Sequence, residues 1–316
     1  MRRGIALSAG LAAGVLGGAT YLSYRTALHE ALARVSTGSQ LVDTTGGPIE
    51  YAAAGDGPPI LFVHGAGGGF DQGLMFGEPL VRAGFRVIAV SRFGYLRTPL
   101  PADASAAAQA DAHACLLDSL AIERATVIGG SAGAPSAMQL AIRHPERVAA
   151  LVLIVPAAYT PRANDAPPLT TPPGTQLLFD TALRSDFVFW AATQLARKAL
   201  IRSVLATPPE IVANASADEQ ARVAAALDQI LPVSRRRLGL LNDATVTSTL
   251  ERYDLERIVA PTMIASAADD LFGTYEAAQF TAEHVPNAAF LGYPSGGHLW
   301  VGHQQELMSE IEAFLR

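Results

Sequence analysis

The chain has 316 residues, of which 50% are hydrophobic and 16% charged, with a formal net charge of −6 and one cysteine. This apolar fraction excludes a disordered chain, and the negative balance gives no electrostatic support for a nucleic-acid partner. The single cysteine excludes an internal disulfide framework and a thiolate zinc cage. The length suits one large α/β domain with an insertion, or two small domains.

Residues 1–35 are set apart from the rest of the chain by an uncharged stretch. Arg2 and Arg3 precede residues 4–24, which carry no charged side chain and are long enough to span a bilayer as a helix. No cysteine directly follows this stretch, which excludes a lipoprotein. The pattern favours a signal-anchor with the arginine pair on the cytoplasmic side. The membrane is then a partner of the protein through this segment.

A cleaved signal peptide is the alternative interpretation of the same residues. Gly17 and Ala19 are small residues with the spacing of a cleavage site. We favour the anchor because Tyr21 and Tyr24 stand where aromatic side chains meet the membrane interface. In both cases we expect the rest of the protein outside the cytoplasm, either anchored and facing the extracytoplasmic side or exported.

Short apolar runs bounded by turn residues recur along the chain after residue 40. Residues 41–54 read as a short antiparallel pair with a glycine turn. Six later runs have the length of buried strands: 60–63, 86–90, 126–128, 151–154, 262–265 and 289–291. Helical patterns lie between them, for example at 104–120 and 134–144. This alternation predicts an α/β fold with a mostly parallel central sheet and helices on both faces.

One long stretch between two predicted strands shows no strand pattern. It opens with a proline-rich loop at 161–173 and continues with helical periodicity over 176–205. A second helix is predicted to begin near Ser216, because Ser216 and Glu219 have the spacing of a capping box. The predicted organisation is an N-terminal segment at 1–35, a core at 36–156 and 251–316, and a helical cap at 157–250.

The five residues from Gly129 to Gly133 carry the clearest chemical signal. They fit the pattern G-x-S-x-G and lie between a predicted strand and a helix that begins near Ala134. In that context a strained strand-to-helix turn exposes the serine hydroxyl. The start of the helix also places a backbone N–H group and a partial positive charge near the anion that forms during acyl transfer. The motif predicts Ser131 as a nucleophile.

With this motif, residues 40–316 resemble the α/β-hydrolase superfamily. The glycine-rich run that starts at His64 resembles the oxyanion loop of that family. The resemblance implies that Ala66 and Ala132 supply the two backbone N–H groups of an oxyanion hole. It also implies that His64 is structural and does not act as the catalytic base.

The other two members of a catalytic triad are expected in the order acid, then histidine. Asp269 and Asp270 follow a predicted strand and resemble the family's acid turn, whose register selects Asp270 and leaves Asp269 as the alternative. A Pro-Ser-Gly-Gly-His run ending at His298 resembles the histidine loop, and its glycines let His298 turn toward Ser131. In such a triad the histidine takes the serine proton, and the carboxylate fixes the histidine tautomer and stabilises the imidazolium.

Other residues bear on cofactors and substrate. Neither the zinc pattern H-E-x-x-H nor a phosphate-binding loop occurs in the sequence, so we expect neither a metal nor a cofactor. Aromatic and aliphatic residues gather in the predicted cap: Phe179, Leu183, Phe187, Phe189 and Trp190. We assign Phe187 and Trp190 to an apolar substrate pocket, with packing inside the cap as the simpler interpretation. The arginine run at 235–237 is expected to be a solvated surface.

A serine at position 131 favours acyl transfer over the epoxide and halide chemistry of relatives that use an aspartate. We therefore expect a serine hydrolase that cleaves a small, apolar carboxylic ester. The alternatives are hydrolysis of carbon–carbon bonds in ring-cleavage products and a cofactor-free perhydrolase or haloperoxidase. Gly130 before the serine and Ala134 after Gly133 depart from the pattern of the carbon–carbon hydrolases. A ligand receptor built on the same fold is the alternative from a different class.

Overall fold

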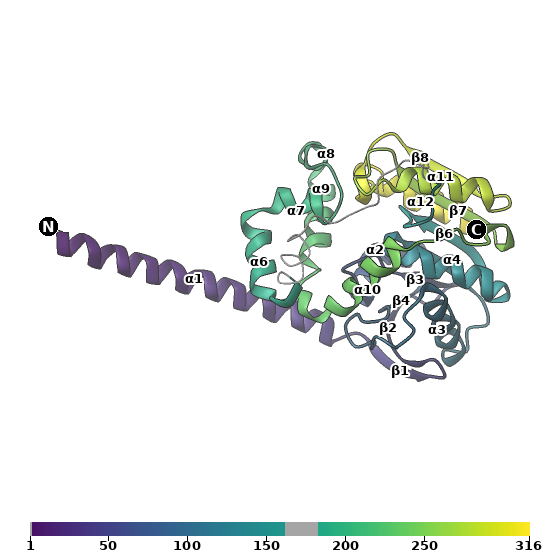
Figure 1. The fold of residues 1–316 in the computed structure, drawn as a ribbon, viewed down its shortest axis with the longest axis horizontal. Helices are drawn as coiled ribbons and strands as arrows, with labels where there is room; N and C mark the ends of the chain where they lie inside the picture. The colour runs from purple at the N-terminus through teal and green to yellow at the C-terminus, as the bar shows by residue number, and fades with distance from the viewer. Residues whose placement is uncertain (1, 162–182) are drawn as a thin grey trace.

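An eight-stranded sheet forms the centre of the computed structural model, which describes residues 2–161 and 183–316 (Figure 1). Its strands lie in the order β1-β2-β4-β3-β5-β6-β7-β8. They are β1 (Gln40–Thr44), β2 (Gly47–Ala54), β3 (Pro59–Val63), β4 (Arg86–Val90), β5 (Ala125–Gly130), β6 (Val148–Ile154), β7 (Thr262–Ala267) and β8 (Ala289–Tyr293). The pairs β1–β2 and β2–β4 are antiparallel, and all other pairs are parallel. The predicted α/β class with a mostly parallel sheet is confirmed.

Helices cover both faces of the sheet because the strand side chains alternate. Ile60 and Phe62 of β3 pack on one face with α2 (Phe70–Arg82) and α12 (Gln304–Leu315). Leu61 and Val63 pack on the other face. The helices on that face are α3 (Ala106–Ser119), α4 (Ala134–Arg143) and α11 (Thr274–His284). Burial on both faces explains why these strands read as continuous apolar runs.

The register of the central strands brings distant loops to one edge of the sheet. Val63 at the end of β3 pairs with Gly129 of β5, and Gly130 pairs with Ile154 at the end of β6. Because parallel strands end at the same edge, the loops that follow β3, β5 and β6 meet there. Ligands of open parallel sheets bind at this carboxyl edge.

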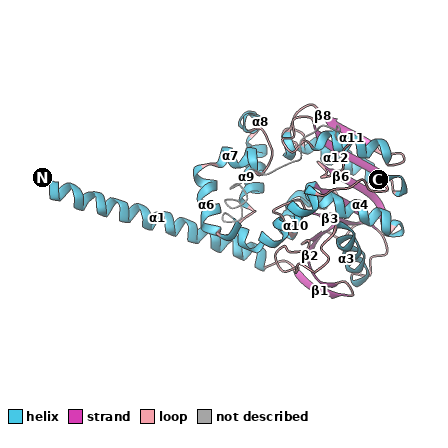
Figure 2. Ribbon diagram, viewed as in Figure 1, coloured by secondary structure: helices cyan, strands magenta, loops and turns pink. Residues whose placement is uncertain are grey.

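The segment between β6 and β7 is helical wherever the structure describes it (Figure 2). It contains α6 (Asp186–Leu195), α7 (Arg197–Ser203), α8 (Pro209–Asn214), α9 (Ala217–Asp228) and α10 (Arg237–Ser248), with short 3-10 turns. Ser216 caps α9 as expected, since its hydroxyl accepts a hydrogen bond from the N–H of Glu219 at 3.3 Å. Phe179 and nearly all of the proline-rich loop lie outside the described residues.

The N-terminal residues form one long helix, α1 (Arg2–Ser36), which projects from the rest of the molecule (Figure 1). Sequence analysis set residues 1–35 apart from the fold, but the last turns of α1 pack into it. Ala31 and Val35 are buried, and the ring of Tyr24 lies 5.1 Å from that of Phe187 on α6. Within 2–161 and 183–316, no helix is both long and apolar enough to cross a membrane.

Candidate active site

Ser131 lies in a sharp turn between β5 and α4. Its φ angle is +47°, a left-handed conformation that costs a serine about 1–3 kcal/mol and that persists only where the surroundings enforce it. Close backbone contacts enforce it here, because a Cβ atom at Gly133 would lie 2.4 Å from the carbonyl oxygen of Val63. Only glycine fits there, so the G-x-S-x-G pattern reflects a physical need for space and presents the serine at the carboxyl edge of the sheet.

A continuous hydrogen-bond chain joins the three residues expected to form a triad. His298 Nε2 lies 2.8 Å from Ser131 Oγ, and His298 Nδ1 lies 2.7 Å from Asp270 Oδ2. Asp270 also accepts hydrogen bonds from the hydroxyl of Thr274 and from the N–H of Phe272. The carboxylate is therefore held in place on several sides and oriented toward the imidazole.

The neighbouring carboxylate, Asp269, has a different partner. Its Oδ1 accepts a hydrogen bond from the N–H of Gly297 at 2.7 Å, which ties the acid turn to the histidine loop. Asp270 thus contacts the imidazole of His298, and Asp269 contacts the backbone of Gly297. The two adjacent aspartates, which the sequence left as alternatives, are distinguished by this geometry.

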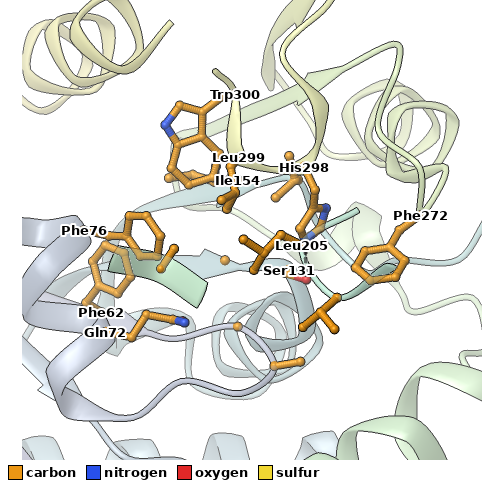
Figure 3. A pocket seen from close by; sticks show the side chains of 16 residues that line it. Phe62, Gln72, Phe76, Ser131, Ile154, Leu205, Phe272, His298, Leu299 and Trp300 are labelled. Atoms are coloured by element: carbon orange, nitrogen blue, oxygen red, sulfur yellow. Dashed lines mark hydrogen bonds between the residues drawn. The ribbon is translucent and has the colours of Figure 1, made fainter. Parts of the chain in front are cut away.

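A cavity of about 100 Å³ opens beside Ser131 (Figure 3). Its lining is largely apolar and includes Phe62, Phe76, Ile154, Leu205, Leu299 and Trp300. Three polar side chains also line it: Ser131, His298 and Gln72. Ala66 lines the cavity as well, whereas Ala132 is buried directly behind the serine at the start of the turn into α4. Sequence analysis missed Gln72 and Leu205, since each is a single residue outside any motif.

The glycine-rich loop after β3, which sequence analysis expects to be the oxyanion loop and which keeps that name below, is held from behind by a group of buried residues that we call the Asp243 cluster: His64, Arg92, Tyr95 and Asp243. Both terminal nitrogens of Arg92 lie 2.6 Å from the Asp243 carboxylate. The Tyr95 hydroxyl donates to the same carboxylate at 2.6 Å and accepts a hydrogen bond from the N–H of Gly67 in the loop. Since Asp243 lies on α10, the cluster joins the helical insertion to the loop.

The histidine of this cluster is neutral. Burial lowers the pKa of His64 well below its ordinary value, and the Arg92 guanidinium lowers it further. Its Nε2 atom accepts a hydrogen bond from the N–H of Arg92 at 3.1 Å. Burial also raises the pKa of Tyr95, which keeps its hydroxyl protonated as a donor to Asp243. The described hydrogen bonds of the His64 ring go to Gly65 and Arg92 and not to Ser131, consistent with the structural role that the resemblance implied.

A second buried group, the Asp71 cluster, contains Arg34, Asp71 and Arg236. Arg236 donates to both carboxylate oxygens of Asp71, at 3.1 and 2.7 Å, and also to the carbonyl oxygen of Gly68. Arg34 of α1 lies 3.0 Å from the same carboxylate. Burial alone would raise the pKa of Asp71, but the two guanidinium groups outweigh it and lower that pKa. Arg236 is fully buried, which corrects the expectation of a solvated surface.

The two residues assigned to substrate binding lie elsewhere. Phe187 is 43% exposed, Trp190 is buried, and neither lines the cavity at Ser131. Their rings pack instead against Tyr24 of α1, at 5.1 and 5.6 Å. The structure therefore does not bring these two residues to the cavity at Ser131, and their packing on α1 matches the simpler interpretation, contacts within the helical part. The part of the chain that the structure describes holds no cluster of metal-binding side chains.

Comparisons with known proteins indicate the family of this chain. A family model described as alpha/beta hydrolase fold matches residues 58–301. The uncharacterized hydrolase YcgS of Bacillus subtilis is 28% identical over 266 residues, which is 82% of this chain and 91% of that protein. The 2-hydroxy-6-oxo-6-phenylhexa-2,4-dienoate hydrolase of Comamonas testosteroni is 34% identical over 113 residues, 34% of this chain and 40% of that enzyme.

Solved structures share the architecture. An alpha/beta hydrolase fold protein from Nakamurella multipartita superimposes with a TM-score of 0.72 at 28% identity, covering 88% of this chain and 98% of that one. An esterase from Exiguobacterium antarcticum, 18% identical, shares the fold with a TM-score of 0.65 over 87% of this chain and 98% of its own. The family match covers most of the chain, and the chain therefore belongs to the α/β-hydrolase family.

Proposed function

We propose that this hydrolase cleaves a carboxylic ester with a short, mainly apolar acyl group, through an acyl-enzyme on Ser131. The observation that carries the proposal is the hydrogen-bond chain from Asp270 through His298 to Ser131, which ends at the wall of the cavity. A serine hydroxyl is a weak nucleophile unless an adjacent base takes its proton. The chain supplies that base and a carboxylate that orients it.

The proposed reaction has two halves. Ser131 Oγ attacks the ester carbonyl as its proton moves to His298 Nε2, and Asp270 stabilises the resulting imidazolium. We assign the N–H groups of Ala66 and Ala132 to the oxyanion of the tetrahedral intermediate. The C–O bond then breaks, and the alcohol leaves with the proton from His298. A water molecule then attacks the acyl carbon as its proton moves to His298, the bond to Ser131 Oγ breaks, and His298 returns the proton to Ser131 as the acid leaves.

The size and lining of the cavity support a small acyl group. Phe62 and Phe76 border it on one side and Ile154 and Leu205 on others (Figure 3), and the volume is about 100 Å³. Apolar walls favour an alkyl chain over a charged one, because a charge buried there would lack a partner. We therefore expect acetyl to butanoyl esters to be better substrates than octanoyl esters.

Carbon–carbon hydrolysis is the second candidate. It is supported by the local identity to the 2-hydroxy-6-oxo-6-phenylhexa-2,4-dienoate hydrolase of Comamonas testosteroni, which covers 34% of this chain. The same serine could attack a ketone in place of an ester. Turnover of a dienoate ring-cleavage product at a higher kcat/KM than any ester would favour this candidate.

The proposal is tested by labelling with a fluorophosphonate probe and by a chain-length series of p-nitrophenyl esters. Ser131→Ala should abolish labelling and lower kcat by about 10⁵- to 10⁶-fold, with an unchanged Tm. Ser119→Ala, which alters an exposed serine at the end of α3, is the matched control and should keep both. A folded wild-type protein that is not labelled, or an active Ser131→Ala variant, would contradict the proposal.

A further inference from the structure

The side chain of Gln72 is the unexplained polar group of the cavity. It projects from the first turn of α2, is only 9% exposed, and lines the cavity that Ser131 and His298 also line. Within 2–161 and 183–316, the side-chain amide has no hydrogen-bond partner. Figure 3 shows the amide pointing into the cavity with its nitrogen foremost.

Gln72 and the nucleophile flank the same piece of backbone. A Cβ atom at Gly65 would lie 3.2 Å from Ser131 Cβ and 3.9 Å from Gln72 Oε1. The amide oxygen rests against the oxyanion loop, since a Cβ atom at Gly68 would lie 2.4 Å from it. The amide oxygen therefore lies on the loop side and the amide nitrogen on the cavity side, in the cavity that Ser131 also lines.

Among the described residues the Gln72 amide has no protein partner, and it borders the cavity, so it is satisfied only by what the cavity holds. Leaving such a donor unsatisfied costs about 1–3 kcal/mol, which is why buried polar groups are nearly always bonded. The neighbouring cavity walls, such as Phe62 and Phe76, offer no acceptor. A bound substrate that places an oxygen near the amide removes this cost, whereas a purely alkyl substrate makes it worse by excluding water. Sites built in this way reject analogues that lack the polar atom.

We propose that Gln72 determines acyl specificity: the acyl group of the natural substrate carries one acceptor oxygen, as a keto or ether group near the ester carbonyl, on an otherwise apolar chain. The amide N–H of Gln72 donates to that oxygen. This inference rests on the proposed ester hydrolysis and narrows its substrate class. Gln72 then selects the substrate, while Ser131 and His298 carry out the chemical step.

The test compares p-nitrophenyl methoxyacetate with p-nitrophenyl butanoate, which differ only by an ether oxygen in place of a methylene group. Each kcat/KM is divided by the rate of hydroxide-catalysed hydrolysis of the same ester, which removes the difference in intrinsic reactivity. The wild-type protein should prefer the methoxyacetate by about tenfold, the upper range of one neutral hydrogen bond. Gln72→Met, which keeps the unbranched shape, should bring the ratio close to one.

Control variants separate selection from other effects. Phe76→Leu alters the same helix and the same cavity without touching a polar group, so both esters should change together and the ratio should persist. Gln72→Leu, which has neither a donor nor an acceptor, serves as the second variant if Gln72→Met does not fold. An unchanged ratio in both Gln72 variants, or an equal slowing of both esters, would overturn the inference.

A binding measurement keeps this test independent of turnover. Methyl methoxyacetate and methyl butanoate are titrated into the Ser131→Ala protein, with and without Gln72→Met, by ligand-observed NMR. A preference for the methoxyacetate that disappears with Gln72 supports the inference even if ester hydrolysis fails. Equal binding of the two esters by the protein that retains Gln72 overturns it, even if Ser131 proves to be a nucleophile.

Discussion

The oxyanion loop separates two polar regions that differ in how their groups are satisfied. On the cavity side, Ser131 and Gln72 line the cavity, where Ser131 is hydrogen-bonded to His298 and Gln72 has no protein partner among the described residues. On the other side, the Asp243 and Asp71 clusters direct their charged groups at protein partners, as in the two 2.6 Å contacts of Arg92 with Asp243. Polar groups that are hydrogen-bonded to other protein groups stabilise the structure. Polar groups that line a cavity without such a partner can bind a substrate.

The clusters also explain how the loop is held. The backbone N–H of Gly67 donates a hydrogen bond to the hydroxyl of Tyr95. The carbonyl oxygen of Gly68 accepts one from the guanidinium of Arg236. Asp243 and Arg236 come from the helical insertion, and Arg34 comes from α1. Two segments that are remote in the sequence therefore buttress the loop that borders the site. Preorganised groups of this kind need no reorganisation during the reaction.

After Ser131→Ala, the largest expected effect concerns the hydrogen-bond chain that leads to the cavity. Asp270→Asn should lower kcat by about 10³- to 10⁴-fold, because an amide cannot stabilise the imidazolium and favours the wrong tautomer of His298. Asp269→Asn should cost less than about tenfold, because its amide oxygen can still accept the hydrogen bond from Gly297. Steady-state kinetics with a saturating ester, together with Tm, measure both. A larger loss in Asp269→Asn would show that the acid is misassigned.

The second prediction concerns the Asp243 cluster. Asp243→Ala should lower the free energy of unfolding by about 3–5 kcal/mol, because it leaves the buried Arg92 without its counter-charge. Asp228→Ala is the matched control: its ion pair with Arg197 has side chains that are 50% and 35% exposed, and its loss should cost less than about 1 kcal/mol. Urea unfolding followed by circular dichroism compares the two. Equal losses would mean that burial does not distinguish these pairs.

The sequence predicted the sheet well because its signals are local. Each parallel strand is a short apolar run, and the side chains of β3 and β4 are buried on both faces. The turn at Ser131 was predictable too, because the glycines it needs are adjacent in the chain. His298 followed from a second local run. Asp270 could be separated from Asp269 only once the direction of each carboxylate was known.

Contacts between distant segments were not predictable. Arg236 stands in a run of three arginines that reads as a solvated surface, yet its partner Asp71 lies 165 residues earlier. Phe187 and Trp190 form an aromatic face that could cover a substrate or another helix, and only the position of α1 decides which. Gln72 belongs to no motif, and its meaning comes from the apolar walls around it.

The smallest expected effect is on how the free energy of unfolding depends on pH. It tests the buried histidines His64 and His113. Burial lowers the pKa of His113 to about 3, and it also lowers the pKa of His64 well below its ordinary value. Above the unfolded-state pKa near 6.5 both states leave these rings neutral. Below it the unfolded chain binds a proton that the folded protein does not, so the folded state loses stability as pH falls.

At pH 5 the His113 ring should have cost about 2 kcal/mol of unfolding free energy relative to pH 7.5. His113→Gln should remove this loss of unfolding free energy between pH 7.5 and pH 5. Glutamine can replace the hydrogen bond to Ser136 and does not titrate. His29→Gln, which alters an exposed histidine of α1, is the matched control. Urea unfolding at the two pH values gives the comparison. If His113→Gln keeps the full wild-type difference, the buried ring must become protonated in the folded protein, and the region behind the oxyanion loop is less closed to protons than its contacts indicate.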